Sequence, residues 1–458
     1  MKKRLTDQYY LESAPIRKTI AHLSIPMMIG LSVTTVYNML NIFFIGLLRN
    51  TDMLSAITLG LPILTILMAF GSLFGVGGGS FVSRLIGQEE FGKAKRIAGY
   101  TFYGSVMAGV VIAFIAYLFI DPFVHLLGAD GATFDYTKNY ALILFAGGFV
   151  IVLNFALEQL VRSEGASRVS MYGMIISTLL SLILDPLFIL VLDWHLAGAA
   201  FAMVLANLGS VIYYVYFLEK KSAHLKGFIK HLKISIPEQL EIYKVGVSEL
   251  LQFAFMIVTT LFLNRFAVEY GDQVMAGFGV ALRIVQIPEF LSMGLCLGMI
   301  PFFANNFGSK NFDRFNAGLK QTVLWIGTIS VFFLGIVYVF REPIFKLFSK
   351  DASLLSLGTY IMATMLISAV FNGFTELFTG VFQATGQGTP LTIMSITQGV
   401  LFIPVIIVLH YLFGLHGVIW SMVITEVITS LLGAVLFILF KRRIHQPKVG
   451  ESVSIPSS

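Results

Sequence analysis

Acidic side chains inside long apolar segments are the groups in this sequence best placed to do chemistry. Asp185 is one of them, since it stands in the apolar run Ser181-Leu182-Ile183-Leu184-Asp185-Pro186. A charged side chain at membrane depth is costly, so it usually marks a functional site. Ser181 lies one helical turn earlier, and Pro186 leaves a backbone carbonyl without its donor. These oxygens could exchange a proton or hold Na⁺; the alternative is a plain Asp-Pro turn at the membrane surface.

Neutral amides in two other apolar segments could complete a cation site around Asp185. Asn38 and Asn41 lie in the first long apolar segment, and Asn207 lies in the sixth. Amide oxygens can face a cation, but buried amides also serve simply as hydrogen-bond partners between helices. We predict a cation-coupling set made of Asp185, Asn41, Ser181, Asn207 and Asn38, and we expect no metal ion other than Na⁺ at Asp185.

The second half of the sequence carries two acids in apolar segments that contain more polar residues than the other segments do. Glu289 follows Arg283 and Gln286 in one segment, and Glu376 follows Asn372 by one helical turn in another. Acids in this setting could attract a cationic ligand. For Glu289 the alternative is a static ion pair that holds the helices together.

Aromatic and sulfur-containing side chains could form the rest of a binding surface for cations. The chain has 42 Phe, 17 Tyr and 18 Met, which give adaptable surface for flat cations. Cation–π contacts stabilise by about 0.5 to 2 kcal/mol each, although most aromatics of such a chain face lipid. Glu158 and Glu249 lie nearer the ends of their segments and are weaker candidates. The predicted substrate-binding set is Glu289, Glu376, Asn372, Arg283, Gln286, Glu158, Phe155, Phe253, Phe255 and Met293.

The elements that hold these residues must be membrane-spanning helices. The chain is 57% hydrophobic and 12% charged, with a mean hydropathy of +0.84, whereas about a quarter of the residues in a soluble domain are charged. A helix needs about 20 apolar residues to cross a bilayer. Twelve stretches qualify, beginning near Ser24, Ser55, Ile97, Asn139, Val169, Ala197, Glu241, Val274, Gln321, Leu355, Leu391 and Gly417. We predict an all-α integral membrane protein with twelve transmembrane helices.

The sequence is duplicated. Gly87, Phe91 and Gly165 recur as Gly308, Phe312 and Gly386, so the offset is 221 residues in each pair. Each half holds an even number of spans and therefore enters the membrane in the same direction, which makes the repeats parallel. We predict an N-terminal six-helix lobe at 1–218, a linker at 219–240, a C-terminal six-helix lobe at 241–445 and a flexible tail at 446–458. Paired bundles of this kind are typical of secondary transporters.

Basic residues predict the orientation, because short cytoplasmic loops collect Lys and Arg. One set of loops carries Lys93, Lys95, Arg96, Lys220, Lys221, Lys226, Lys230, Lys233, Lys441, Arg442 and Arg443, and the other carries Arg49, Lys138, Arg265, Arg341, Lys346 and Lys350. Both termini are therefore expected in the cytoplasm. The basic linker is expected to form a surface helix, either as a plain tether or as a lipid sensor. The net charge of +6 then reflects topology and headgroup attraction rather than nucleic-acid binding.

Several kinds of chemistry find no support in the sequence. The cluster Gly75-Val76-Gly77-Gly78-Gly79-Ser80 lacks the Lys-Ser/Thr that completes a phosphate-binding loop. The eight His form no metal-ligand spacing, and no nucleophile-elbow pattern is present. Cys296 is the only cysteine. We expect no enzyme activity and no cofactor, so uphill transport would draw on a gradient of H⁺ or Na⁺.

Six motifs in order identify a family resemblance. The chain resembles the multidrug and toxic compound extrusion (MATE) transporters from about Ser13 to Arg443, and most closely their MepA-like multidrug efflux branch. The motifs are Ser24–Gly30 (SIPMMIG), Leu40–Gly46 (LNIFFIG), Phe74–Ser80 (FGVGGGS), Ile183–Pro186 (ILDP), Arg283–Glu289 (RIVQIPE) and Phe382–Gly388 (FQATGQG). The resemblance implies two six-helix lobes around a V-shaped cleft. Many relatives pair an Asp of the first span with the Asp of the fifth, whereas Asn41 stands at the first of these places here.

The resemblance also implies a function. We expect a bacterial inner-membrane exporter that acts as a monomer and antiports cationic aromatic drugs against inward H⁺ or Na⁺ by alternating access. A flippase for lipid-linked oligosaccharides or peptidoglycan precursors is the alternative with the same broad fold. It would need several Arg or Lys in the cleft to bind pyrophosphate, and only Arg283 lies deep enough. A channel or a membrane-embedded enzyme would need a continuous polar pore or a clustered nucleophile or metal set.

Overall fold

The computed structural model describes residues 7–46, 50–346 and 352–445, and these are helical with no strand among them. Eleven helices in this part of the chain are long and apolar enough to cross a membrane, and the bent pair formed by α6 and α7 makes a twelfth span. The predicted all-α membrane fold with twelve spans is confirmed.

The helices follow one another with short connections in both halves. The first half contains α1 (Asp7–Glu12), α2 (Ile16–Gly46), α3 (Thr51–Gly87), α4 (Phe91–Leu118), α5 (Ile120–Leu126), α6 (Ala132–Ala146), α7 (Gly148–Ser163), α8 (Ser167–Pro186), η1 (Leu187–Val191), α9 (His195–Tyr216) and η2 (Phe217–Lys221). The short turn η3 (Phe228–Lys230) lies between the halves. The second half contains α10 (Ile236–Glu269), α11 (Asp272–Gly308), α12 (Phe312–Val339), α13 (Arg341–Lys346), α14 (Ala352–Thr385), α15 (Gly388–Val400), α16 (Phe402–Phe413) and α17 (Leu415–His445).

Two helix distortions reflect local sequence. The axis bends by 53° between α6 and α7, where Gly147 and Gly148 interrupt the helix. The α8 helix ends at Pro186 and continues as the π-helical turn η1, because proline cannot donate the hydrogen bond that an α-helix needs there. Such π turns are frequent at functional sites, and Asp185 stands two residues before the start of this one.

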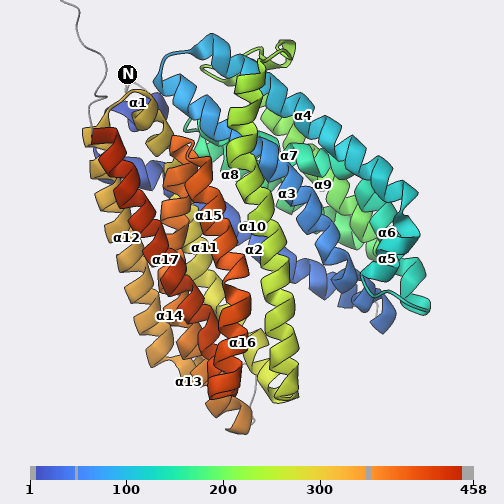
Figure 1. Cartoon of the computed structure of the whole chain (residues 1–458). Coiled ribbons are helices and arrows are strands. Elements are labelled where there is room, and N and C mark those ends of the chain that lie inside the picture. Colours follow the sequence, from blue (N-terminus) through green and yellow to red (C-terminus); the bar gives the residue numbers. More distant parts are fainter. Residues whose placement is uncertain (1–6, 47–49, 347–351, 446–458) are drawn as a thin grey trace, which may run out of the picture.

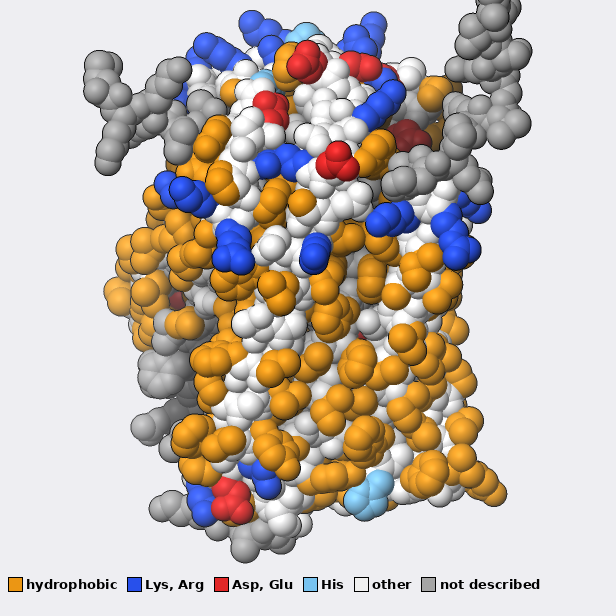
Figure 2. Space-filling model, turned by 90° about the vertical axis from the view of Figure 1, so that its left-hand side faces the viewer, with side chains coloured by type: hydrophobic (Ala, Val, Ile, Leu, Met, Phe, Trp, Pro, Cys, Tyr) orange, Lys and Arg blue, Asp and Glu red, His pale blue; other side chains and the backbone are white. Residues whose placement is uncertain are grey.

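One end of the molecule is rich in Lys and Arg. We call it the basic end; it carries the α3–α4 turn, the linker and the α11–α12 turn, with Lys93, Lys95, Arg96, Lys220, Lys221, Lys226, Lys230, Lys233 and Lys310. Figure 2 shows one face of the molecule, with basic side chains toward its upper end and hydrophobic side chains over its middle. This pattern of an apolar belt below a charged end is the one expected of a bilayer-embedded protein.

The two halves contact each other toward the basic end and part toward the end that carries α5 and α13 (Figure 1). The α3 helix packs on α10 and α11, and α2 packs on α11. The hydrogen bonds that cross between the halves there include Ser24 Oγ to the Leu295 carbonyl (3.0 Å), Ser83 Oγ to the Pro301 carbonyl (3.2 Å) and Asn306 Nδ2 to the Leu11 carbonyl (3.0 Å). The structure is therefore closed at its basic end.

The linker differs from the surface helix expected from the sequence. Between η2 and α10 it forms only the single 3₁₀ turn η3. The Glu164 carboxylate, at the end of α7, accepts hydrogen bonds from Ser222 Oγ (2.5 Å), His224 N (3.0 Å) and Leu225 N (3.0 Å). Gly227 has a φ of 80°, a left-handed turn that no helix continues through. Leu225 and Phe228 are buried against the first half, so the linker is part of that half's packing.

Candidate functional site

The first half of the chain buries Asp185 completely, with 0% of the residue exposed. Two donors from α2 reach the same carboxylate oxygen: Tyr37 Oη donates to Oδ2 at 3.0 Å, and Asn41 Nδ2 donates to it at 2.9 Å. Tyr37 and Asn41 share one face of α2 because they are four residues apart. The other oxygen, Oδ1, is buried and accepts no hydrogen bond within the described part of the chain. That oxygen is the atom at which a proton or a cation would be bound.

Other polar groups surround this carboxylate. Ser181 is buried one turn before Asp185 on α8, and its hydroxyl interacts with the Tyr37 hydroxyl. Tyr140 on α6 is close enough to Asp185 to interact with it electrostatically. The site is thus made by three helices, α2, α6 and α8, and it contains one carboxylate with neutral oxygen-bearing side chains around it.

The predicted amides divide between this site and a separate contact. Asn41 belongs to the Asp185 site. Asn207 instead accepts a hydrogen bond from Asn154 Nδ2 at 2.9 Å and donates to the Met203 carbonyl at 2.8 Å. The side chain of Asn38 lies outside the described residues. Tyr37 was not among the predicted residues, although its position one turn before Asn41 was a signal that could have identified it.

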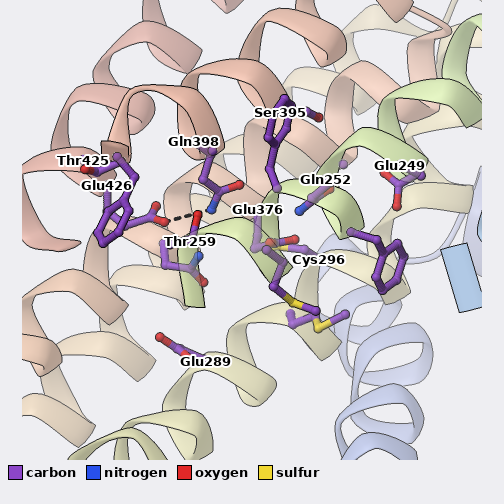
Figure 3. Close-up of a pocket in the computed structure, with 18 of the residues that line it drawn as sticks. Glu249, Gln252, Thr259, Glu289, Cys296, Glu376, Ser395, Gln398, Thr425 and Glu426 are labelled. Atoms are coloured by element: carbon purple, nitrogen blue, oxygen red, sulfur yellow. Dashed lines mark hydrogen bonds between the residues drawn. The ribbon is translucent and has the colours of Figure 1, made fainter. Parts of the chain in front are cut away.

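The second half encloses a cavity of about 400 Å³. It lies among α10, α11, α14, α15 and α17, with one residue from α16. Four glutamates line it, namely Glu249, Glu289, Glu376 and Glu426, and no Lys, Arg or His is among the lining residues. Figure 3 shows these glutamates on different helices around the cavity. Four carboxyl groups with no basic partner make this cavity suited to a cation.

The four glutamates fall into two kinds. Glu249 accepts a short hydrogen bond from Gln383 Nε2. Glu426 accepts one from Gln398 Nε2 at 2.8 Å and one from Thr375 Oγ1 at 3.2 Å. Glu289 and Glu376, by contrast, accept no hydrogen bond from the residues that the structure describes. The first pair is held in position by side-chain donors, whereas the second pair is available to a ligand.

Apolar and aromatic side chains form a large part of the cavity wall, beside neutral polar ones such as Gln252, Thr259 and Asn372. The apolar and aromatic side chains include Phe253, Phe255, Met256, Phe290, Met293, Leu297, Ile300, Phe402 and Met422. Six predicted residues line the cavity: Glu289, Glu376, Asn372, Phe253, Phe255 and Met293. A flat cation would therefore find both carboxylates and ring faces within one space.

Four predicted substrate residues lie elsewhere. Arg283 and Gln286 are exposed on α11 and do not line the cavity, and no ion pair between Arg283 and Glu289 occurs among the described residues. Phe155 packs against the core of the first half. Glu158 is buried there and pairs with Arg162, Oε1 to Nη1, at 3.1 Å. Glu426 was missed, although an acid inside the apolar α17 gave the same signal as Glu376.

The sequence model of the MatE family matches residues 26–187 and 245–408, which are most of both halves. The chain belongs to the MatE family. This confirms the resemblance inferred from the six motifs. It also places the protein among membrane transporters, and not among enzymes.

The relatives of this MatE protein match it over nearly its whole length. It is 38% identical over 436 residues to the multidrug export protein MepA of Staphylococcus aureus (strain MRSA252), covering 95% of this chain and 96% of the relative. It is 40% identical over 435 residues to MepA of Staphylococcus haemolyticus (strain JCSC1435), with the same coverage. Among solved structures, MATE in complex with MaD3S is 26% identical with a TM-score of 0.88, and it covers 96% of this chain and 99% of that one. MATE in the straight conformation is 25% identical, with the same TM-score and coverage.

Proposed function

We propose that this transporter exports cationic aromatic compounds in exchange for an inward-moving cation, H⁺ or Na⁺. The observation that carries the proposal is the cavity lined by Glu249, Glu289, Glu376 and Glu426 with no basic side chain among its lining residues. The similarity to multidrug export proteins over 95% of the chain supports the same conclusion.

The cavity supplies two kinds of group that can bind a flat cation, namely carboxylates and aromatic rings. Glu289 and Glu376 have no hydrogen-bond donor among the described residues, so their carboxylates can pair with a ligand's positive charge. Phe253, Phe255 and Phe290 offer ring faces, and each cation–π contact stabilises by about 0.5 to 2 kcal/mol. Methionines add polarisable surface that adapts to ligands of different shape. Such a lining accepts a range of cationic compounds rather than a single one.

The Asp185 site is the proposed place of ion coupling. Oδ2 already accepts two hydrogen bonds, from Tyr37 and Asn41, while Oδ1 accepts none from the described residues. An inward H⁺ or Na⁺ would bind at Oδ1 and neutralise the charge of the buried carboxylate. Because a buried charge is costly inside a membrane, its neutralisation changes the stability of the surrounding helix packing and can bias the two halves toward a different arrangement.

The lobes would then alternate the access to both sites. We take residues 1–218 and 241–445 as the moving lobes and 219–240 as their linker. Basic loops face the cytoplasm in most membrane proteins, so the basic end is the cytoplasmic end and both termini lie on that side. The structure, closed at its basic end, is then closed to the cytoplasm. A monomer suffices for this cycle because both sites lie within one chain.

The flippase alternative is less well supported. Pyrophosphate recognition calls for Arg or Lys that face the substrate, but the second-half cavity is lined by four glutamates and no Arg or Lys. Arg283, the one deep basic residue that the sequence offered for this role, does not line the cavity.

Dye transport by the purified protein in lipid vesicles tests the proposal. Ethidium movement is followed with an inward H⁺ gradient, with an inward Na⁺ gradient and with neither. We expect uphill transport with one of the two gradients and none without a gradient. Lack of uphill transport under all three conditions would overturn the proposal. Transport of a lipid-linked pyrophosphate in place of ethidium would favour the flippase.

A further inference from the structure

Gln383 connects the acidic cavity to the contact between the two halves. Its side-chain amide, Nε2, donates to the carboxylate of Glu249 inside the cavity. Its backbone carbonyl, in the last turn of α14, accepts a hydrogen bond from Arg84 Nη1 at 3.3 Å. Arg84 belongs to α3, in the first half of the chain. One residue therefore touches both the proposed drug site and the opposite lobe.

Within the described part of the chain, the hydrogen-bond and ion-pair partners of Arg84 at the basic end belong to the second half, and the guanidinium also lies over the ring of Phe81 on its own helix, 5.3 Å from the centroid. Arg84 is 7% exposed, and Nη1 donates to the carbonyls of Gln383 and Ala384, each at 3.3 Å. Its Nη2 lies 3.8 Å from the Glu241 carboxylate on α10. The last carbonyls of a helix lack partners within the helix and carry partial negative charge, so they attract a cation. The guanidinium thus caps the end of α14 from the other lobe.

The chain after α14 is shaped to receive this guanidinium. Gly386 has a φ of +71°, and a Cβ there would lie 2.8 Å from Arg84 Cζ. Only glycine combines that backbone turn with the space for the guanidinium.

The capping contact is suited to breaking and reforming. Hydrogen bonds of 3.3 Å are at the long limit for a charged donor, and a buried charge with incomplete partners gains hydration when it is exposed. Parting the lobes at the basic end would break the two carbonyl contacts and return Arg84 to water. The closed arrangement is therefore stabilised only by the modest difference between the free energy of the Arg84 contacts in the closed state and the free energy of hydrating Arg84 in the open state.

We propose that Gln383 is a positioning residue that couples cation binding in the cavity to the closure of the basic end by Arg84. A cationic compound that pairs with Glu289 and Glu376 also attracts the carboxylate of Glu249, which lines the same cavity, and draws it away from the Gln383 amide. The last turn of α14 is then free to move, and the carbonyls that Arg84 caps move with it. The inference rests on the proposed function, since it requires the cavity to bind cations. A ligand shifts the lobes only because it binds the two arrangements unequally.

Gln398 provides a matched control within the same cavity. Its Nε2 donates to Glu426 at 2.8 Å, as Gln383 donates to Glu249. Gln398 lies on α15, whereas both carbonyls that Arg84 caps belong to α14. The two glutamines therefore make the same kind of contact with a cavity glutamate, but only Gln383 also makes the contact with the other lobe.

The experiment measures ethidium binding and lobe separation in the same full-length protein. Spin labels are attached to cysteines at Gly92 and Asp313, exposed positions of the α4 and α12 starts, in a Cys296→Ala background. Gln383→Met and Gln398→Met each keep the side-chain length and remove the amide donor. In the unsubstituted background, saturating ethidium is expected to shift the distance distribution. Gln398→Met should change ethidium affinity but keep the shift.

Gln383→Met should still bind ethidium but lose the response. We expect the ethidium-induced change in the population ratio to fall by about tenfold, the value of one hydrogen bond to a charged group. A response in Gln383→Met equal to that of the unsubstituted background would overturn the inference, as would an equal loss in both Met variants. If the unsubstituted protein binds no ethidium, the proposed function fails first, and the inference fails with it.

Arg84→Lys tests the other end of the connection and does not depend on the folding of Gln383→Met. Lysine keeps the charge but presents a compact ammonium in place of the guanidinium fork. We expect a larger fraction of lobe-open molecules without ligand, by about threefold to tenfold. An unchanged distance distribution, with and without ethidium, would contradict a role for Arg84 in closure.

Discussion

Gly87 and Gly308 occupy the same place in the two halves, and each backs directly onto the main chain of the other half. A Cβ on Gly87 would lie 2.2 Å from the Asn305 carbonyl oxygen, and one on Gly308 would lie 2.2 Å from the Arg84 carbonyl oxygen. Arg84 and Asn305 are themselves related by the 221-residue offset of the repeat. The crossing of α3 and α11 at the basic end therefore obeys the internal symmetry of the chain.

This crossing predicts that Gly308→Ala prevents closure of the basic end. A methyl group cannot fit 2.2 Å from a backbone oxygen, so the two helices would have to move apart. We expect ethidium transport in vesicles to fall by about tenfold or more, since a loss of roughly 1.4 kcal/mol in the closed state already has that effect. Gly92→Ala is the control, because a Cβ at Gly92 meets nothing within 4 Å. Equal transport rates for the two variants would count against the prediction.

Tyr37→Phe should weaken ion coupling without abolishing it. The substitution removes the hydroxyl that donates to Asp185 Oδ2 at 3.0 Å and leaves the donor of Asn41 in place at 2.9 Å. Losing one hydrogen bond to a charged group changes an equilibrium by about tenfold. The concentration of H⁺ or Na⁺ that gives half-maximal ethidium transport should shift by up to about that factor. An unshifted ion dependence would show that the hydroxyl does not act on the coupling ion.

Glu376→Gln and Glu289→Gln should each weaken the binding of cationic dyes. These two carboxylates line the cavity and accept no hydrogen bond from the described residues, so a ligand's charge is their natural partner. We expect the ethidium Kd to rise by about tenfold for each, the magnitude of a charged hydrogen bond. Glu342→Gln, at an exposed position of α13, makes the same chemical change outside the cavity and should leave the Kd unchanged. If both cavity variants bind and transport like the wild type, the two acids are structural.

Glu164→Ala should destabilise the first half through the linker. The carboxylate accepts three hydrogen bonds from Ser222, His224 and Leu225. Without it, Leu225 N keeps Ser222 Oγ as an acceptor at 2.7 Å, but the buried Ser222 hydroxyl and the His224 N–H lose theirs, at a cost of about 1 to 3 kcal/mol. Thermal unfolding in detergent would show a lower midpoint than the wild type. Glu219→Ala provides the comparison, because its carboxylate accepts a single hydrogen bond from the described part of the linker, from Ile229 N at 2.9 Å. A midpoint for Glu164→Ala above that of Glu219→Ala would contradict the role assigned to Glu164.

The sequence could predict those features that depend on local composition and spacing. The twelve spans follow from the length of apolar segments, and the repeat follows from the spacing of Gly87, Gly165, Gly308 and Gly386. Asp185 and Asn41 could be placed in one site because each is a polar residue deep in an apolar segment, and the family resemblance put them together. These signals are contained in the residues themselves and need no knowledge of how one helix is rotated against another.

The rotation of each helix about its axis could not be predicted. Arg283 and Gln286 share α11 with Glu289, yet only Glu289 lines the cavity. In helices that are apolar on all sides, the pattern does not say which face turns inward. The prediction for the linker was wrong for a related reason. Its alternation of basic and apolar residues favours a surface helix, whereas the contacts of Glu164 and the turn at Gly227 hold the linker in another conformation.

In the proposed transport cycle, a cationic compound is exchanged for H⁺ or Na⁺, and the ion binds at Asp185. The most direct measurement is ion flux driven by the dye alone. Vesicles containing the purified protein are given an ethidium gradient with no initial gradient of H⁺ or Na⁺, and the opposite movement of each ion is recorded for wild type and Asp185→Asn. For the wild type, we expect the dye gradient to drive one of the two ions in the opposite direction. For correctly folded Asp185→Asn, we expect no exchange of dye for either ion. Dye movement without ion flux in the wild type, or exchange by Asp185→Asn at the wild-type rate, would contradict the proposed cycle.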